Sequence, residues 1–135
     1  MPNYATHALL GTGVGAVYSC VIQDNRQVQA GTSQRETNPF HVGMCAFAGF
    51  LGSCVPDKLE PADRAIGPNH RGSCHSLWAL GLAIKGAYYF SQQQTKTELE
   101  RWVADFLGAF CAGIASHLAA DMTTARGLNF AAKGF

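Results

Sequence analysis

Four long apolar segments, separated by polar stretches, constrain the fold of this chain more than any other feature. They cover residues 5–22, 42–55, about 73–91 and 99–121, and the last is the longest. None shows the alternation of apolar and polar residues that is typical of a half-buried strand. The sequence therefore predicts an all-α fold, a bundle of about four main helices.

Turn and capping residues predict where these helices begin and end. Pro56 is expected to close the second helix, because its ring disfavours helical conformation in the residue before it. Thr95 and Glu98 have the spacing of a capping box, which predicts the start of the last helix. Residues 23–39 are polar and are predicted to form an exposed loop, and residues 58–69, with two prolines, are predicted to form an irregular crossing.

The composition limits the partners of such a bundle. The formal net charge is +1, from ten basic and nine acidic residues, so no strong signal points to nucleic acid. Charged residues make up 14% of the chain, against about 25% in an average soluble domain, so little of the surface is polar. The length of 135 residues fits a single domain, 1–135. Membrane association stays open, and the oligomeric state is not predicted.

The lengths of the apolar runs leave two environments open. A membrane-spanning helix needs about 20 predominantly apolar residues, whereas the uninterrupted runs here extend over about 14 to 18. The helices could bury one another as a soluble bundle or lie in a bilayer around a polar centre, and the run lengths favour the soluble bundle. No secretory signal pattern is found, so the cytoplasm is the expected default and secretion is not expected.

The last helix carries a pair of residues that indicates chemistry. His117 and Asp121 are four positions apart, so they project from the same helix face. Their neighbours are apolar, and an ionised carboxylate in such surroundings costs several kcal/mol unless it is paired or bound to a metal. One interpretation is chelation of a metal ion. The alternative is a hydrogen bond between the two side chains near an exposed helix end.

Three further polar residues favour the metal interpretation. His70 and His75 lie together in the stretch NHRGSCHS, and Asp57 ends the second apolar run. Each alone is weak, since single histidines are usually structural and an acid after proline usually forms a turn. Together they supply the mixture of imidazole and carboxylate that zinc and similar ions accept, provided that the helices bring them together.

Four motifs in this order resemble the YdjM-like family of inner-membrane proteins described as metal-dependent hydrolases. They are His7 in the first helix, Pro-Asp at 56–57, HRGxxHS at 70–76 and SHxxxD at 116–121. The resemblance covers most of the chain. It implies a helical bundle with an interior metal site, hydrolase activity and association with the inner membrane.

That family is in turn similar to the helical superfamily of zinc-dependent phospholipases C and single-strand nucleases. The similarity implies one or two divalent ions, with zinc expected first and manganese or another ion as the alternative. The residues implied for a first ion are Asp57, His70 or His75, His117 and Asp121. His7 would serve a neighbouring ion bridged by Asp121. A full centre of three ions is not expected, because residues 122–130 contain no further histidine.

Hydrolysis is the reaction class that such ions support, because they lower the pKa of coordinated water towards about 7. Asp57 is the predicted proton acceptor, with Glu60 in reserve, and Arg71 is predicted to hold an anionic group of the substrate. Arg71 could instead cap a helix or pair with an acid nearby. The implied substrate is a small-molecule or lipid phosphoester. Two hypotheses compete with this one. The first is a non-catalytic binding protein with a structural metal, and the second is a helical protein without metal.

Other motifs carry less weight. GTGVG at 11–15 is assigned to helix packing, because no strand precedes it and the lysine of a phosphate-binding loop is missing. His41 is predicted to lie at the surface or to cap a helix. The five cysteines form no CxxC pair and are expected to be reduced packing residues.

Overall fold

The chain forms an all-α bundle, as predicted from its apolar segments. The computed structural model describes residues 4–31, 36–59 and 73–123. Within these ranges the helices are α1 at Tyr4–Gln29, α2 at Pro39–Leu59, α3 at Leu77–Ser91 and α4 at Glu98–Met122, and a short 3-10 helix, η1, covers Ser73–His75.

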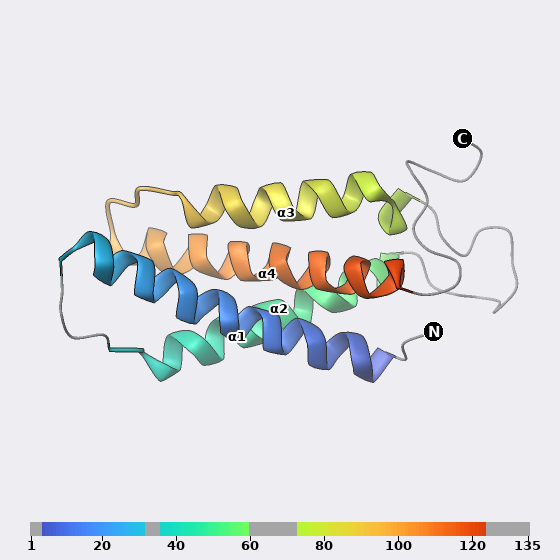
Figure 1. Ribbon diagram of the computed structural model, residues 1–135, viewed down its shortest axis with the longest axis horizontal. Coiled ribbons are helices and arrows are strands. Elements are labelled where there is room, and N and C mark those ends of the chain that lie inside the picture. The colour runs from blue at the N-terminus through green and yellow to red at the C-terminus, as the bar shows by residue number, and fades with distance from the viewer. Residues whose placement is uncertain (1–3, 32–35, 60–72, 124–135) are drawn as a thin grey trace, which may run out of the picture.

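Successive helices run in opposite directions along the bundle (Figure 1). α1, α2 and α4 pack against one another, and α3 packs on α4. The start of α1, the end of α2, η1 and the end of α4 consequently lie at one end of the bundle (Figure 1). At about 1.5 Å per residue, α1, α2 and α4 are each roughly 30 to 40 Å long, which matches the hydrocarbon core of a bilayer.

Small and polar side chains fill the interior of the bundle, and many large apolar side chains face outward. The buried residues of α1 follow the helical period and are His7, Gly11, Gly15, Ser19 and Ile22. Leu9, by contrast, is 74% exposed and Phe40 is 76% exposed. Large apolar residues are usually buried in soluble proteins, whereas helices in a bilayer pack through small residues because lipid tails are as apolar as leucine. The distribution is that of a membrane bundle.

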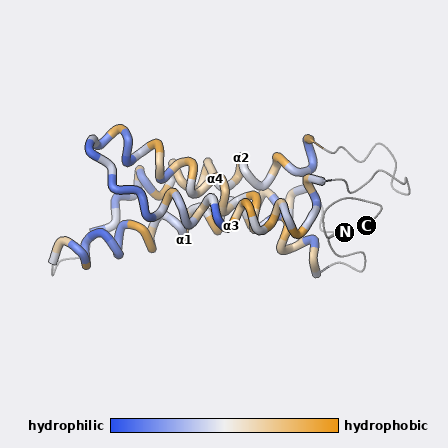
Figure 2. The backbone as a smooth tube through the Cα atoms, turned by 90° about the horizontal axis from the view of Figure 1, so that it is seen from above, coloured by the Kyte–Doolittle hydropathy of each residue, from blue (hydrophilic) through white to orange (hydrophobic). Residues whose placement is uncertain are grey.

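Hydropathy along the chain follows the same pattern. Figure 2 shows hydrophilic residues gathered at the end of the bundle that holds the end of α1 and the start of α2, with mostly neutral to apolar residues along its middle. α1, α2 and α4 are each long and apolar enough to cross a membrane. α3 has only 15 residues and one buried side chain, Ala83.

Glycines allow the three central helices to approach one another closely. A Cβ on Gly49 of α2 would collide with the carbonyl oxygen of Gly11 on α1. A Cβ on Gly113 of α4 would collide with the carbonyl oxygen of Gly49. Any larger residue at these positions would separate the helices, so the glycines set the spacing of α1, α2 and α4. The helix-packing role predicted for GTGVG is confirmed at Gly11, which lies in this contact.

Two predicted helix ends are wrong. Pro56 does not close α2, because the helix continues through it to Leu59. A proline is tolerated inside membrane helices where neighbouring helices and side chains satisfy the freed backbone groups. α1 likewise continues to Gln29, so the first part of the predicted loop at 23–39 is helical. The longer helices bring α1 and α2 above the length that a membrane span requires.

The start of α4 is shifted by two residues from its predicted position. The capping box consists of Thr97 and Glu100, not of Thr95 and Glu98. The Glu100 backbone N–H donates to the Thr97 hydroxyl over 3.2 Å, and the Thr97 backbone N–H donates to the Glu100 carboxylate over 3.3 Å. Both pairs have the same Thr-x-x-Glu spacing, so the pattern alone could not choose between them.

Candidate metal centre

Five polar side chains from four elements converge at one end of the bundle. His7 lies near the start of α1, Asp57 near the end of α2, His75 at the end of η1, and His117 and Asp121 in the last turns of α4. The antiparallel order of the helices brings them together, although they are far apart in the sequence. We call these five residues the His117 cluster.

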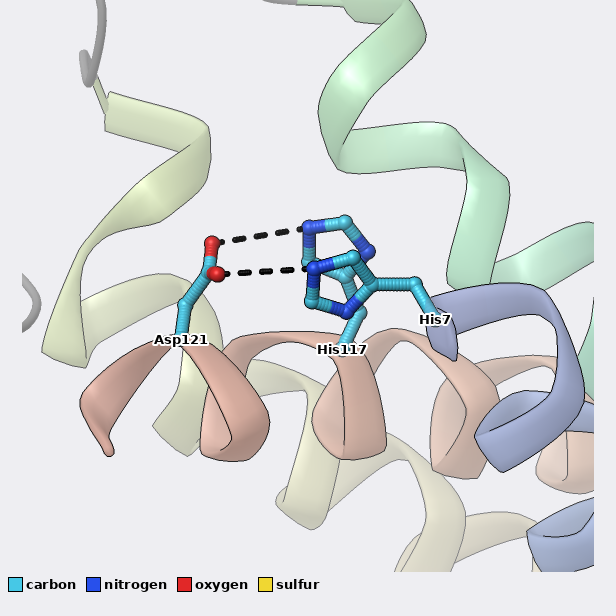
Figure 3. A group of neighbouring side chains, drawn as sticks. All are labelled: His7, His117 and Asp121. Carbon is cyan, nitrogen blue, oxygen red and sulfur yellow. Dashed lines mark ion pairs between the residues drawn. The ribbon is translucent and has the colours of Figure 1, made fainter. Parts of the chain in front are cut away.

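Asp121 connects three imidazoles of the cluster. Its Oδ1 lies 3.5 Å from His7 Nε2, and its Oδ2 lies 3.6 Å from His117 Nε2, as the dashed lines in Figure 3 mark. Oδ2 is also 3.7 Å from His75 Nε2. The predicted placement of His117 and Asp121 on one helix face, towards His7, is therefore found in the structure.

Asp57 approaches the same imidazoles from the other side of the cluster. Its Oδ1 lies 3.5 Å from His75 Nε2 and 3.5 Å from His117 Nε2. The side chain of Asp57 is 41% exposed, whereas that of His117 is fully buried. The remaining members of the cluster are buried as well. Asp57 is thus the member of the cluster that faces outward.

The orientation of His117 is fixed by the backbone of α2. Its Nδ1 lies 2.6 Å from the carbonyl oxygen of Ser53. A carbonyl only accepts, so Nδ1 carries the proton and donates, and in the neutral ring Nε2 presents a lone pair to the cluster. Nε2 is buried without a hydrogen-bond partner. A buried polar atom without a partner requires an explanation, and a histidine whose second nitrogen is fixed in this way is typical of a metal ligand.

The spacing of the cluster fits a metal ion better than direct hydrogen bonds. Separations of 3.5 to 3.7 Å between nitrogen and oxygen exceed the usual hydrogen-bond length of about 2.7 to 3.2 Å. Ligands bonded to zinc at about 2.0 to 2.1 Å in a tetrahedron lie about 3.3 Å from one another. Two sets of residues have donor atoms within 4.8 Å of one another: His7, His117 and Asp121, and Asp57, His75 and His117. These donors are geometrically able to hold a metal ion.

Some predicted site residues cannot be compared with the structure. Glu60, His70 and Arg71 lie outside the described residues. Of the two histidines predicted as alternative ligands, the structure brings His75 into the cluster. The roles predicted for Glu60, His70 and Arg71 stay predictions, and so do the roles predicted for the residues of the cluster.

A second buried group of polar residues was missed by the sequence analysis. His41 was predicted to lie at the surface or to cap a helix, and this is wrong, because it is buried with its Nε2 2.9 Å from Asp105 Oδ2. Arg26 donates to both oxygens of Asp105, over 2.5 and 2.6 Å. His41 Nδ1 lies 2.6 Å from Ser19 Oγ. We call Ser19, Arg26, His41 and Asp105 the Asp105 network.

One signal could have predicted this network. Asp105 is an acid inside the apolar segment WVADFLGAF, and the argument that an apolar environment requires a partner for Asp121 applies to it equally. The partners themselves could not have been named, because Arg26 is 79 positions away and His41 is 64 positions away. Pairing across that distance depends on the packing of three helices.

The helix lengths, the outward-facing apolar residues and the buried polar groups define this chain as a helical membrane protein with an interior histidine and carboxylate cluster. The sequence profile of the YdjM inner membrane protein family matches residues 1–132, so the chain belongs to that family. Searches of curated proteins and of solved structures found no match. Association with the inner membrane, implied by the resemblance, is confirmed. This finding supports the membrane environment over the soluble bundle that the run lengths favour.

Proposed function

We propose that this chain is a membrane-embedded hydrolase that depends on a divalent metal ion held by the His117 cluster. The observation that carries the proposal is the buried Nε2 of His117, which has no hydrogen-bond partner and lies among carboxylate oxygens 3.5 to 3.6 Å away. Zinc is the expected ion, because it accepts mixed imidazole and carboxylate ligands, and manganese is the alternative.

The cluster is suited to one ion. His117 belongs to both sets of donor residues, and its Nδ1 is already bonded to Ser53. Its single lone pair at Nε2 can bind one ion only. Whichever set His117 joins, a second ion would be left with two donor residues of the other set among those described, either His7 and Asp121 or Asp57 and His75. We therefore propose one ion in place of the one or two implied by the resemblance.

The residues in and around the cluster have different roles in this proposal. Ser53 holds the ring of His117 in place through its carbonyl, and Asp121 lies between His7 and His117. Asp57 is the exposed carboxylate and accepts the proton of the attacking water. A bound divalent ion would supply a lowered pKa for that water and would polarise a phosphoryl oxygen.

A phosphoester is the proposed substrate class. This part of the proposal rests on the resemblance to zinc-dependent phospholipases C and nucleases. Arg71 would hold the anionic group of the substrate and Glu60 would serve as the reserve base. A lipid phosphoester is compatible with the position of the cluster at one end of a membrane bundle, where lipid headgroups lie.

A structural metal is the second candidate function, and one observation favours it. Five donor residues converge on the cluster, and zinc sites with four protein ligands and no open position are structural. In that case the ion would fasten α1, α2, η1 and α4 together without catalysis.

Metal content is the first test of the proposal. Elemental mass spectrometry on the untagged, detergent-purified protein is expected to find about one zinc or manganese ion per chain. The His117→Gln variant is expected to lose the ion. His41→Gln is the matched control, because His41 is also a buried histidine beside a buried aspartate, and it is expected to retain the ion. Metal-free wild type after reconstitution, or a His117→Gln variant with full metal content, would contradict the site.

Asp57→Asn separates the two candidate functions. The other four members of the cluster are buried and remain in place, so the variant is expected to retain the ion. If Asp57 is the proton acceptor, hydrolysis of a chromogenic phosphodiester or of phospholipid should fall about 100-fold or more. Metal-loaded wild type that hydrolyses neither compound would favour the structural role.

A further inference from the structure

The outer face of α3 carries a groove that the proposed function does not use. The groove has a volume of about 400 Å³, and its lining among the described residues is Leu77, Trp78, Gly81, Leu82 and Lys85. These five residues lie along one exposed stripe of α3. The groove shares no described residue with the His117 cluster.

The shape of the groove depends on Gly81. A Cβ added there would meet no atom within 4 Å, so the glycine forms an open floor. Trp78 and Leu82 stand beside it and are 61% and 64% exposed. The part of the groove that the described residues form is thus apolar and exposed, and in a bilayer its surroundings are lipid acyl chains.

Lys85 places a positive charge in this apolar groove. It is the only charged residue of α3. The ion pairs among the described residues do not include it, and its side chain is exposed. An unpaired cation on the apolar face of a membrane protein is unfavourable unless it reaches the interface or an anion. The groove therefore calls for an occupant that is apolar along most of its length and negatively charged at one end.

We propose that this groove binds an anionic phospholipid of the surrounding membrane. One acyl chain lies over Gly81 beside Trp78, and the phosphate accepts a charge-assisted hydrogen bond from Lys85. Lys85 is six residues before the end of α3 at Ser91, about 9 Å along the helix, so its flexible stem can extend towards the interface at that end. The lipid belongs to the leaflet opposite the His117 cluster. This inference does not depend on the proposed function.

Charge argues against the other occupants. A second copy paired symmetrically through the same face would bring Lys85 against Lys85, and α3 has no acidic residue to compensate. A helix of another protein would need an acidic side chain at a depth where such residues are rare. Anionic lipid supplies the negative charge at the interface without that requirement.

Native mass spectrometry of the full chain, titrated with phosphatidylglycerol or phosphatidylcholine, tests the proposal. The wild type is expected to bind phosphatidylglycerol at least about fivefold more tightly than phosphatidylcholine. Lys85→Gln is expected to abolish this preference. Gly81→Leu fills the groove without touching the rest of the fold, and it is expected to weaken the binding of both lipids. Gly13→Leu on α1, where a Cβ also meets no atom within 4 Å, is the matched control and should bind as the wild type does.

Three outcomes would overturn the proposal. The first two are an unchanged preference for phosphatidylglycerol in Lys85→Gln and unchanged lipid binding in Gly81→Leu. The third concerns a protein partner: a photo-crosslinking residue placed at Leu82 is expected to label lipid in native membranes. Labelling of a protein at that position, with no lipid adduct, would assign the groove to a helix instead.

Discussion

The two buried groups of histidine and aspartate in this bundle contain the same kinds of residue but differ in spacing. In the Asp105 network, Asp105 lies 2.5 Å from Arg26 and 2.9 Å from His41. In the His117 cluster, Asp121 lies 3.5 Å from His7 and 3.6 Å from His117. The first set of distances is that of direct hydrogen bonds, and the second leaves room for an atom between the side chains. Spacing, not composition, distinguishes a structural network from a candidate ligand site.

Hydrogen bonding separates the two groups in the same way. Ser19 accepts a hydrogen bond from Gln23 over 2.9 Å and lies 2.6 Å from His41. Both nitrogens of His41 therefore have partners, and the guanidinium of Arg26 compensates the charge of Asp105. His117, by contrast, has one bonded nitrogen and one buried nitrogen without a partner. The Asp105 network is complete by itself, whereas the His117 cluster is suited to a further component.

The largest expected effect comes from breaking the Asp105 network. Asp105→Ala removes the carboxylate that binds both Arg26 and His41, and it should lower the free energy of unfolding by about 3 to 5 kcal/mol. Unfolding in mixed micelles of mild detergent and dodecyl sulfate measures the change. Metal content should stay at the wild-type value, because none of the proposed ligands is touched.

Asp105→Asn is the control for this experiment. The amide keeps the shape of the side chain and one acceptor oxygen, so the loss should be smaller than for alanine. Loss of the metal ion from either variant would contradict the separation of the two groups.

Removal of the ion should have the next largest effect. At free zinc about 100 times its dissociation constant, binding contributes about 3 kcal/mol to stability, which a chelator should remove from the wild type. Asp105→Asn should lose the same amount, because Asp105 and His117 are 12 residues, or about 18 Å, apart along α4 and share no partner. If the chelator lowers the free energy of unfolding of the wild type and of Asp105→Asn by amounts that differ by more than about 0.5 kcal/mol, the Asp105 network and the His117 cluster are coupled.

The sequence predicts the helices better than their ends. The long apolar segments indicate four helices, because burial in a bundle and burial in lipid both require such segments. The extension of α2 through Pro56 could not be predicted, since it depends on neighbouring helices that satisfy the freed backbone groups. The membrane environment itself is visible in the structure, where Leu9 and Phe40 face outward around a core of small residues.

The sequence also predicts the ligand candidates better than their partners. His117 and Asp121 lie four positions apart on one helix, so their shared face follows from the helical period. Asp57 was a candidate by residue type alone, and the contribution of His7 was implied only by the family resemblance, because bringing both to α4 requires the relative position of three helices. His41 was misassigned for the same reason, since nothing local to it indicates that Asp105 lies beside it.

The smallest expected effects come from two serines, one in each group. Ser19→Ala removes the hydroxyl between Gln23 and His41 and leaves the buried Nδ1 of His41 with only the weak contact to Cys45 Sγ at 3.9 Å, so it should cost about 1 to 3 kcal/mol. Ser53→Ala removes only a hydroxyl that donates to the carbonyl of Phe50 within the same helix, and it should cost about 0.5 kcal/mol or less. Unfolding in mixed micelles measures both.

Metal affinity sharpens this last comparison. Ser53 fixes His117 through its backbone carbonyl, which alanine also provides, so Ser53→Ala should bind the ion as tightly as the wild type does. Ser19→Ala should bind it equally well, because Ser19 lies 12 residues, or about 18 Å, from His7 along α1. Weaker binding of the ion by Ser53→Ala would mean that the serine hydroxyl, and not the backbone, orients His117. Weaker binding of the ion by Ser19→Ala would mean that the Asp105 network and the His117 cluster are coupled through α1, on which both Ser19 and His7 lie.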